Sequence, residues 1–313
     1  MKKLTIITPC FNEEQNVEIC ALELKRIMQE KLPGYDYEHI FSDNSSTDST
    51  LSRLKEICLG DPHVKVIANS RNVGPFRSMW NAMKSASGDA IIPLLPADLQ
   101  DPPEVIPRLV QQWELGFLVT YGVRQNRQEG LVMRLARGAY YRIIKKFAST
   151  DIPINSGEFL LADRRIIDSI LEVDDQYPYI RGLIAQTGVP SASVEYTWVK
   201  REHGKSKNSF FSLIDQAING FVSTSRVPAR LALLAGFCIS MLGIAYALIT
   251  TILVLTSSNY IPIGIPTIIV GVFFLGGVQL LFLGLIGEYI LSTHDQVRKR
   301  PAMFEIERIN FKE

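Results

Sequence analysis

Carboxylate, amide and guanidinium side chains follow a series of short apolar runs that are expected to be strands. In chain order these segments are Pro9 to Glu13, Asp43 to Ser46, Arg71 and Asn72, Asp98, and Gly122 to Arg124. Carboxylate and amide oxygens suit a divalent cation or the hydrogen-bond donors of a nucleoside, whereas guanidinium groups suit diphosphate oxygens. The residue types therefore predict a site for a ligand that carries phosphate, with a metal ion beside it.

The acids in the second of these segments are expected to have different tasks. Asp43 ends an apolar run and precedes a polar turn, so its carboxylate is placed to accept hydrogen bonds from a uracil ring or a ribose. Asp48 closes that turn, and its position predicts the N-cap of a helix from Asp48 to Cys58.

The acids between Asp98 and Glu104 are also expected to have different tasks. Asp101 is expected to be an N-cap, with Pro102 in the first helical position and Glu104 completing a capping box. Asp98 lies before that cap and has no capping role of its own, so we predict that it contacts the metal and the diphosphate. Gln100 is expected to add a neutral oxygen.

Arginines complete the candidate set, and each of them has a solvated surface charge as its alternative role. Four arginines fall in loops or at the ends of expected elements, namely Arg71, Arg124, Arg127 and Arg201. Guanidinium groups in such places are predicted to bind diphosphate oxygens.

Strand and helix patterns alternate through the first two thirds of the chain. Expected strands are Leu4 to Thr8, His39 to Asp43, Val64 to Ala68 and Ala90 to Leu95, and expected helices are Glu14 to Lys31, Asp48 to Cys58, Val73 to Ala86 and Pro102 to Leu115. This alternation predicts a mostly parallel sheet with helices on both faces, in which ligands gather at the carboxyl ends of the strands. The chain contains neither G-x-G-x-x-G nor a Walker A pattern, which disfavours a dinucleotide oxidoreductase and a P-loop ATPase.

Composition narrows the class of protein further. Lys and Arg number 33 against 32 Asp and Glu, a net charge of +1, which argues against nucleic acid as a partner. Hydrophobic residues make up 47% of the chain, which excludes a disordered protein. The four cysteines, at positions 10, 20, 58 and 238, form no C-x-x-C pair and are expected to be reduced.

One long uncharged stretch predicts a membrane hairpin. No Asp, Glu, Lys or Arg occurs from Leu231 to Gly287, and the polar stretch from Thr256 to Pro266 divides this run into spans of about 231–255 and 267–289. Basic residues precede the first span and follow the second, so the positive-inside rule places both ends in the cytoplasm. A buried helical hairpin in a soluble core is the alternative.

Three smaller features accompany the hairpin. Apolar residues at helical spacing from Phe210 to Val222 predict an amphipathic helix that lies on the membrane or packs on the soluble domain. Gly284, Gly277 and Phe273 share a stripe with Glu288, which makes a homo-oligomer reasonable. The first residues do not have the pattern of a secretory leader, so the hairpin itself is expected to direct insertion of the chain into the membrane.

Seven segments, taken together, resemble a known family. They are TPCFNEEQNV, SDNSSTDST, SRNVGPFRSMWNA, SGDAIIPLLPADLQDPPE, NSGEFLLADRR, REHGKSK and LGLIGEYI followed by RKRP. In this order and spacing they resemble the membrane-bound family 2 glycosyltransferases. More narrowly, they resemble the polyprenyl-phosphate glycosyltransferases, which include dolichol-phosphate mannose synthase and bactoprenol glucosyltransferase.

The resemblance implies an α/β fold of the GT-A type, a UDP- or GDP-linked sugar donor, Mg or Mn as cofactor, and inverting transfer to a polyprenyl phosphate at the cytoplasmic face of the inner membrane. It implies a GT-A domain over 1–207, an interfacial helix over 208–229, two transmembrane helices within 230–290 and a cytoplasmic tail over 291–313. The implied donor contacts are Pro9, Asn12, Glu13, Asp43, Arg71 and Asp98. Asp98 and Gln100 would face the metal, and the implied phosphate contacts are Arg124, Arg201, Ser206 and Lys207.

Four positions depart from the family pattern. Pro96 stands where an Asp is usual, so the D-x-D motif keeps only Asp98, and Asn44 replaces a second Asp that is common in the turn after the second strand. Asn155 replaces an Asp that is a candidate for the base on the acceptor side, and Leu160 replaces an Arg. Glu158 keeps an acid near Asn155 and is the candidate substitute, so the expected catalytic residues are Asp98, Asn155 and Glu158.

Two further functions stay open on these residues. One is a family 2 transferase with another acceptor, although the chain has no Q-x-x-R-W and only two expected spans, both unfavourable to a processive synthase. The other is a degenerate transferase that serves as a membrane scaffold or a nucleotide-sugar sensor, which the lost acids favour and the retained Asp43 and Asp98 disfavour.

Overall fold

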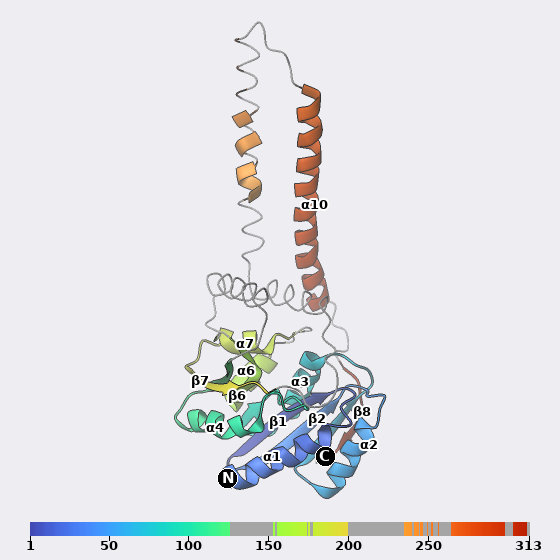
Figure 1. Ribbon diagram of the computed structural model, residues 1–313, viewed down its shortest axis with the longest axis vertical. Helices are drawn as coiled ribbons and strands as arrows, with labels where there is room; N and C mark the ends of the chain where they lie inside the picture. Colours follow the sequence, from blue (N-terminus) through green and yellow to red (C-terminus); the bar gives the residue numbers. More distant parts are fainter. Residues whose placement is uncertain are drawn as a thin grey trace. The chain divides into compact units, whose positions relative to one another are not determined.

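The chain folds into two compact units, of which the first contains both ends of the sequence. A computed structural model describes residues 1–125, 153, 155–173, 175, 178–199, separate positions between 235 and 256, 264–297 and 303–311 (Figure 1). One unit joins Met1–Ser209 to Lys299–Glu313, and the other comprises Phe210–Arg298. The chain therefore leaves the first unit once and returns to it.

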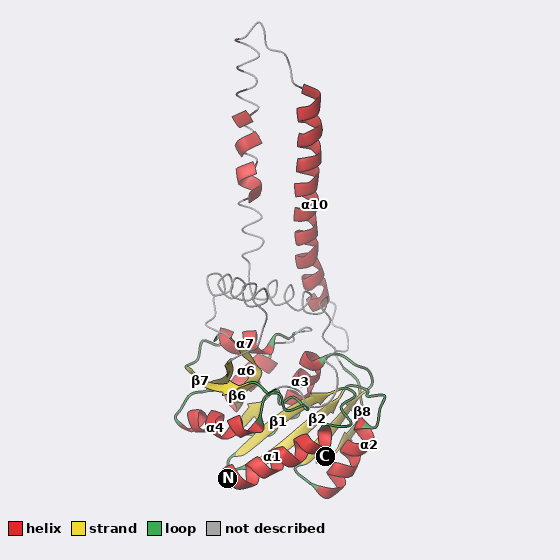
Figure 2. Ribbon diagram, viewed as in Figure 1, coloured by secondary structure: helices red, strands yellow, loops and turns green. Residues whose placement is uncertain are grey.

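Among the described residues, the first unit is built on one sheet of eight strands, in the order β7-β5-β6-β4-β1-β2-β3-β8. The strands are drawn in yellow in Figure 2. The strands are β1 Lys3–Cys10, β2 Asp36–Asp43, β3 Val64–Asn69, β4 Ala90–Ile92, β5 Val119–Gln125, β6 Ser156–Asp163, β7 Ser191–Thr197 and β8 Glu305–Ile309. Neighbours pair in parallel except where β6 meets β4 and β5 and where β8 meets β3. The prediction of a mostly parallel sheet is confirmed for the remaining strands, and β6 and β8 make the sheet mixed.

Helices cover both faces of this sheet, as predicted. They are α1 Val17–Lys31, α2 Thr50–Gly60, α3 Pro75–Lys84, the short 3-10 helix η1 Pro103–Val105, α4 Ile106–Glu114, α6 Arg164–Leu171 and α7 Ile180–Gln186. Because successive side chains of a strand point to opposite faces, Ile6 packs in the core beneath α1, α2 and α4, whereas Ile7 packs in the core beneath α3, α6 and α7. Burial on both faces explains why the strands read as continuous apolar runs.

The strand β4 is shorter than expected. It ends at Ile92 rather than at Leu95, because Pro93 and Pro96 have no backbone N–H to donate to a neighbouring strand. The chain therefore crosses from Ile92 to η1 as an irregular loop, and this loop carries Asp98 and Gln100.

The C-terminal residues also differ from the expected tail. The helix α10 runs over Gly264–Val297, eight residues past the predicted end of the second span, and β8 then pairs antiparallel with β3. The Asn310 side chain donates to the backbone carbonyls of Cys58 at 2.9 Å and Val64 at 2.8 Å, which fixes the tail in the first unit.

Within the described residues, one helix is long and apolar enough to cross a bilayer. Its most apolar window is Phe274–Leu291 in α10, and 34 helical residues extend over about 51 Å, against a bilayer core of about 30 Å. The predicted interfacial helix over 208–229 and most of the predicted first span over 231–255 lie outside the described residues.

Candidate functional site

The sheet brings the predicted site residues to one edge. Cys10 at the end of β1 is in register with Asp43 at the end of β2, and Asp43 with Ala68 near the end of β3. On the other side, Val123 near the end of β5 is in register with Ser156, the first residue of the antiparallel β6. The carboxyl ends of the parallel strands and the start of β6 therefore share an edge, which we call the carboxyl edge.

Two loops of this edge are tied together by side chains. The backbone N of Asn12 donates to Ser46 Oγ at 2.9 Å, and Asn12 Oδ1 accepts from the backbone N of Thr47 at 2.8 Å. The backbone N of Glu13 donates to Thr50 Oγ1 at 2.9 Å. Asn12 and Glu13 thus hold the turn after β2 in place, and Pro9 lies opposite Ser42 inside β1.

Asp43 is held at the end of β2 with 1% of its surface exposed. Its Oδ1 accepts from the Ser46 hydroxyl at 2.5 Å and its Oδ2 from the Ser46 backbone N at 3.2 Å. Burial raises the pKa of Asp43, and the bonds from Ser46 partly offset that rise. A carboxylate oxygen has more than one lone pair, so Asp43 retains capacity to accept from the base of a nucleotide.

Beside Asp43 lies a buried layer of polar side chains that the sequence pattern did not predict. Asn69 Nδ2 donates to Ser42 Oγ at 3.2 Å and to Asn44 Oδ1 at 3.3 Å, and the Ser78 hydroxyl donates to Ser42 Oγ at 2.8 Å. Asn44, which replaces the second Asp of the family, is thereby paired with another amide. The sequence feature that could have indicated this layer is Asn69, an amide at the end of the apolar strand β3.

Asp48 lies one residue before the N-cap of α2 and bonds the start of that helix. The N-cap of α2 is Ser49, and Asp48 Oδ1 accepts from the backbone N of Thr50 at 3.0 Å and from its hydroxyl at 2.5 Å. The predicted helix start at Asp48 is therefore wrong by two residues, while the carboxylate still bonds the first backbone N–H of the helix.

Asp98 and Gln100 lie together in the loop after β4. Asp98 is partly buried, and its Oδ1 accepts from the Gln100 backbone N at 3.3 Å. Leu99 between them has a φ of 53°, in the left-handed region. Oxygen donors of this kind suit Mg or Mn, and the described residues contain no group of three acidic, His or Cys side chains that could hold a metal ion. These donors fit a cation that arrives with a diphosphate, since Mg²⁺ is commonly held by one or two carboxylates together with substrate phosphates.

Asp101 does not cap a helix, contrary to the prediction. The residue before η1 is Pro102, which has no side-chain cap, and Glu104 is paired with Arg26 at 3.1 Å. Asp101 is instead buried, with 1% of its surface exposed, and it forms a two-pronged ion pair with Arg124. Arg124 Nε lies 2.9 Å from Oδ1 and Nη2 lies 2.6 Å from Oδ2. Pro102 has an extended backbone with a ψ of 135°, as is usual for a residue before proline, so the helix begins only at Pro103.

Tyr196 completes this cluster, which we call the Asp101 cluster. Its hydroxyl donates to Asp101 Oδ1 at 2.5 Å and lies 3.1 Å from Arg124 Nε. Arg124 was predicted to bind phosphate, and the geometry adds a pairing with Asp101 that the sequence did not indicate.

Asn155 and Glu158 lie at the start of β6. Asn155 has a φ of 65° and its carbonyl accepts from the Arg124 backbone N at 3.2 Å. Glu158 is buried and accepts from the Arg181 backbone N at 3.1 Å, with Arg181 Nε at 4.0 Å from its Oε1. Burial raises the pKa of Glu158, and Arg181 opposes that rise. Leu160, which replaces the family Arg, is fully buried in the core.

The remaining predicted residues fall in two groups. Arg71 is exposed in the loop after β3, at the carboxyl edge. Arg127, Arg201, Ser206 and Lys207 lie outside the described residues.

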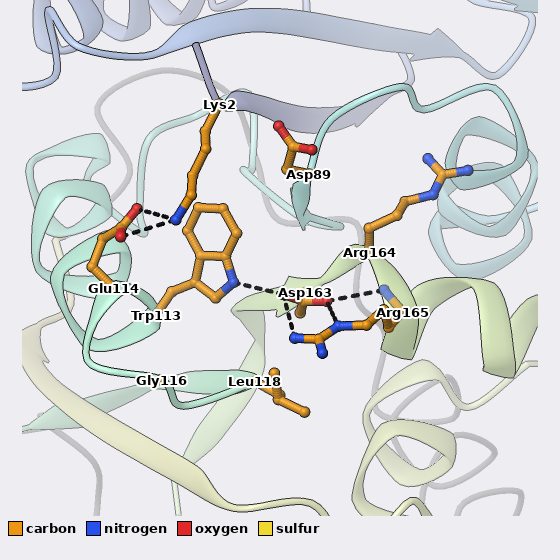
Figure 3. Close-up of a pocket in the computed structure, with 9 residues that line it drawn as sticks. All are labelled: Lys2, Asp89, Trp113, Glu114, Gly116, Leu118, Asp163, Arg164 and Arg165. Carbon is orange, nitrogen blue, oxygen red and sulfur yellow. Dashed lines mark hydrogen bonds and ion pairs between the residues drawn. The ribbon is translucent and has the colours of Figure 1, made fainter.

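A hollow of about 540 Å³ lies at the opposite edge of the sheet (Figure 3). Its polar lining is already paired: Lys2 Nζ lies 2.9 Å from Glu114, and Trp113 Nε1 and Arg165 Nε donate to Asp163 at 2.9 and 2.8 Å. None of the predicted site residues that the structure describes lines this hollow, so it is not the candidate site.

Comparisons with known proteins identify the family to which this fold belongs. Residues 5–171 match the model of the family described as Glycosyl transferase family 2. The chain is 34% identical over 298 residues to the "Uncharacterized glycosyltransferase YkcC" of Bacillus subtilis (strain 168), covering 95% of this chain and 91% of that protein. It is 30% identical over 300 residues to the "Prophage bactoprenol glucosyl transferase homolog" of Escherichia coli (strain K12), covering 96% of this chain and 97% of that protein.

Among solved structures, the chain is similar to the mannosyltransferase PcManGT from Pyrobaculum calidifontis in complex with GDP-Man and Mn2+. The identity is 14% and the TM-score 0.49, and the match covers 95% of this chain and 86% of that chain. The family match covers more than half of the 313 residues, and it coincides with the strands whose carboxyl ends form the candidate site. The chain thus has a GT-A-like α/β fold with a mixed sheet, is a glycosyltransferase, and belongs to glycosyl transferase family 2.

Proposed function

We propose that this protein transfers a sugar from a nucleotide-sugar donor to a polyprenyl phosphate, with inversion, at the cytoplasmic face of the membrane. Relatives named as bactoprenol glucosyl transferases align over nearly the whole chain, including α10. This full-length match supports a lipid acceptor in preference to a soluble one.

The observation that carries the proposal is where the last strand before the second unit ends and where the first strand after that unit begins. Thr197, the last residue of β7, lies at the carboxyl edge, in register with Gln125. Glu305, the first residue of β8, lies at the same edge, in register with Asn69. The last strand before residues 210–298 therefore ends, and the first strand after them begins, at the edge that carries Asp43 and Asp98, which supports an acceptor anchored in a bilayer.

The same connections support two membrane crossings. Because β8 pairs with β3, the residues after α10 belong to the same side of the membrane as the residues before residue 209. A chain that starts and finishes on one side crosses an even number of times, so a crossing by α10 requires another between residues 210 and 263. The uncharged stretch from about 231 to 255 is the segment we assign to it. Arg226 and Arg230 before this span and Arg298 to Arg300 after α10 place both ends in the cytoplasm.

The donor is assigned to the half of the edge formed by β1 to β4. Pro9, Asn12, Glu13 and Arg71 line the nucleotide pocket in this proposal, and Asp43 accepts a hydrogen bond from the base. Asp98 and Gln100 hold Mg or Mn, which when bound neutralises charge that develops on the diphosphate leaving group. Asp98 remains as the carboxylate of the motif that Pro96 interrupts.

The acceptor is assigned to the side formed by β5 and β6. An oxygen of the lipid phosphate forms a bond to the anomeric carbon of the sugar while the bond from that carbon to the diphosphate breaks. The phosphate is already anionic at neutral pH, so the step needs no strong base. Asn155, which cannot take up a proton at neutral pH, is compatible with this chemistry, and Glu158 provides the acid nearest to it. Arg124 and the segment with Arg201, Ser206 and Lys207 are assigned to the phosphates of donor and acceptor.

Transfer of radiolabelled sugar into extractable lipid tests the proposal. Purified protein is supplied with undecaprenyl phosphate, Mg or Mn, and a panel of UDP- and GDP-linked sugars. We expect a mild-acid-labile glycolipid with the wild type and at least about a hundredfold less with Asp98→Ala, since neutralising the charge on the leaving group is the main contribution to the rate of such transfers. Asp168→Ala is the matched control, because Asp168 is an exposed carboxylate on α6.

Each contrary result has a defined meaning. No labelled lipid from folded wild-type protein with any donor contradicts transfer to polyprenyl phosphate. Label in a product that resists mild acid indicates another acceptor, whereas nucleotide binding without any product indicates a sensor.

A further inference from the structure

We propose that the Asp101 cluster is a positioning unit that sets the conformation of the loop bearing Asp98 and Gln100. The inference rests on the proposed function, and it gives Asp101 and Tyr196 a part in the reaction although neither belongs to the expected contacts of donor or acceptor.

The cluster joins three separate parts of the sheet. Asp101 ends the loop after β4, Arg124 lies in β5 and Tyr196 lies in β7. Both oxygens of Asp101 are engaged by Arg124, at 2.9 and 2.6 Å, and the Tyr196 hydroxyl adds a third bond at 2.5 Å. Exposure is 1% for Asp101 and 5% for Tyr196, so water does not compete for these bonds.

The loop between Ile92 and Pro103 needs such an anchor. It has no regular secondary structure, and its backbone is held at one end where Leu95 N donates to Ile7 O at 2.8 Å. At the other end Gln100 O accepts from Val199 N at 3.1 Å, and Asp101 follows directly. Asp98 and Gln100 therefore lie between a fixed point on β1 and the Asp101 cluster.

The backbone between these two points is strained. Leu99 has a φ of 53°, in the left-handed region, which residues other than Gly, Asn and Asp adopt only at an energetic cost. Such a residue persists only where its surroundings determine it. Its side chain packs against the core beneath α1, and two residues later the ion pair with Arg124 holds the chain. Loss of the cluster is expected to let this loop relax and to move Asp98 and Gln100.

A metal-binding measurement separates this positioning role from a general loss of stability. Binding of Mn²⁺ is measured by calorimetry on the full chain in detergent, with UDP or GDP present at saturation, and nucleotide binding is measured again without metal. For Tyr196→Phe, which removes one bond to a charged group, we expect about tenfold weaker Mn²⁺ binding. Nucleotide binding without metal is expected to stay within about twofold, because Tyr196→Phe leaves the two bonds between Arg124 and Asp101 in place and does not touch the loops that bear Asp43.

Tyr35→Phe is the matched control. The Tyr35 hydroxyl also donates to a carboxylate, Glu114 Oε1, at 2.5 Å, and it lies at the edge opposite the site. This variant is expected to keep the Mn²⁺ affinity of the wild type. Asp101→Asn is expected to weaken Mn²⁺ binding more than Tyr196→Phe does, because it removes the charge that pairs with Arg124. A thermal unfolding curve establishes that each variant is folded.

The outcomes distinguish the two proposals. If folded Tyr196→Phe and Asp101→Asn bind Mn²⁺ as the wild type does, the positioning role is wrong while the proposed function stands. If equal losses occur in Tyr35→Phe, the effect is a general one and the positioning role is also wrong. If the wild type binds neither UDP nor GDP, the proposed function fails and the positioning role fails with it.

Discussion

Backbone strain is concentrated at the carboxyl edge. Among the described residues, the non-glycine positions with positive φ are Asn12, Ser45, Leu99, Asn155 and Asn310, and the first four lie in the loops of that edge. Asn adopts this region readily, whereas Ser45 and Leu99 do so at a cost of roughly 1 to 3 kcal/mol each and persist where neighbouring contacts determine them. The bonds of Asn12 to the turn after β2 provide those contacts at one position. This edge is thus built for accurate placement of side chains at some expense of stability.

Asp43 provides a prediction at the scale of one residue. Burial raises its pKa, and the proposed contact with the base requires the ionised carboxylate as acceptor. Nucleotide affinity should therefore be complete above the raised pKa and fall as the pH drops through it, at a pH above the value of about 3.9 of an ordinary Asp. Calorimetric titration with UDP or GDP, from neutral pH down to the pKa of an ordinary Asp, measures this loss.

Asp43→Asn supplies the control for that titration. It should bind nucleotide more weakly at neutral pH and should lack the acid-dependent loss, because no proton is taken up at this position. A variant that retains the full acid-dependent loss would show that another group is responsible.

At the scale of elements, one buried acid joins the central strands. Glu38 in β2 has 1% of its surface exposed, and it accepts from Thr5 Oγ1, Lys65 Nζ and the Ser87 backbone N, each at 2.6 Å. Thr5 Oγ1 accepts in turn from the Gly88 backbone N at 2.9 Å. This network lies in the half of the sheet away from the candidate site, so its task is to hold β1, β2, β3 and the connection into β4 together.

The network makes stability depend on pH. Burial alone would raise the pKa of Glu38, but the bonds from Lys65, Thr5 and Ser87 outweigh it and lower the pKa to about 2. Because this value lies below that of the unfolded chain, about 4.3, the stabilisation is complete above about pH 4.3 and is lost as the pH falls towards 2.

Glu38→Gln should remove this contribution at neutral pH. We expect a loss of about 3 kcal/mol, which lowers the melting temperature by about 6 to 12 °C, together with a weaker acid dependence of melting between about pH 5 and about pH 3. Thermal unfolding of the detergent-solubilised protein measures both. Glu114→Gln, which affects an exposed pair with Lys2, should change the melting temperature much less. Equal shifts in the two variants would contradict the role of burial.

At the scale of the whole molecule, the first unit contains sequence from both sides of the apolar region. β1 lies inside the sheet and β8 at its end, so the sheet is complete only after α10 has been made. The final strand is followed by Asn310, which binds the backbone around the end of α2 and the start of β3. Folding of this unit is thereby linked to the return of the chain from the apolar region.

Cysteine labelling tests the proposed two-span topology. In a Cys238→Ser background, Asn259→Cys in the connection between the spans should react with a membrane-impermeant maleimide on intact cells. Glu307→Cys in β8 should react only after the membrane is permeabilised, because β8 is on the side of the catalytic domain. The other cysteines of the described residues, Cys10, Cys20 and Cys58, are buried and provide a low background. Reaction of both engineered cysteines from the same side would contradict two spans.

Local pattern determined the elements and their order. Apolar runs, turn residues and helix starts predict β1 to β4 and α1 to α4 to within a few residues, because each depends on neighbours in the chain. Once parallel strands are inferred, their carboxyl ends must share an edge, and this is why Asp43 and Asp98 could be assigned to one site from the sequence.

Only the tertiary structure decided the long-range partners. Asp101 is 23 residues from Arg124 and 95 from Tyr196, and Asn310 is 252 residues from Cys58. A helix cap depends on the next few residues, so the pattern around Asp101 predicted a cap. A buried carboxylate, however, requires a cation and donors from whichever elements the fold brings beside it, and no local pattern specifies those. For the same reason the pairing of Glu158 with Arg181 and the return of β8 to the sheet became visible only in the folded chain.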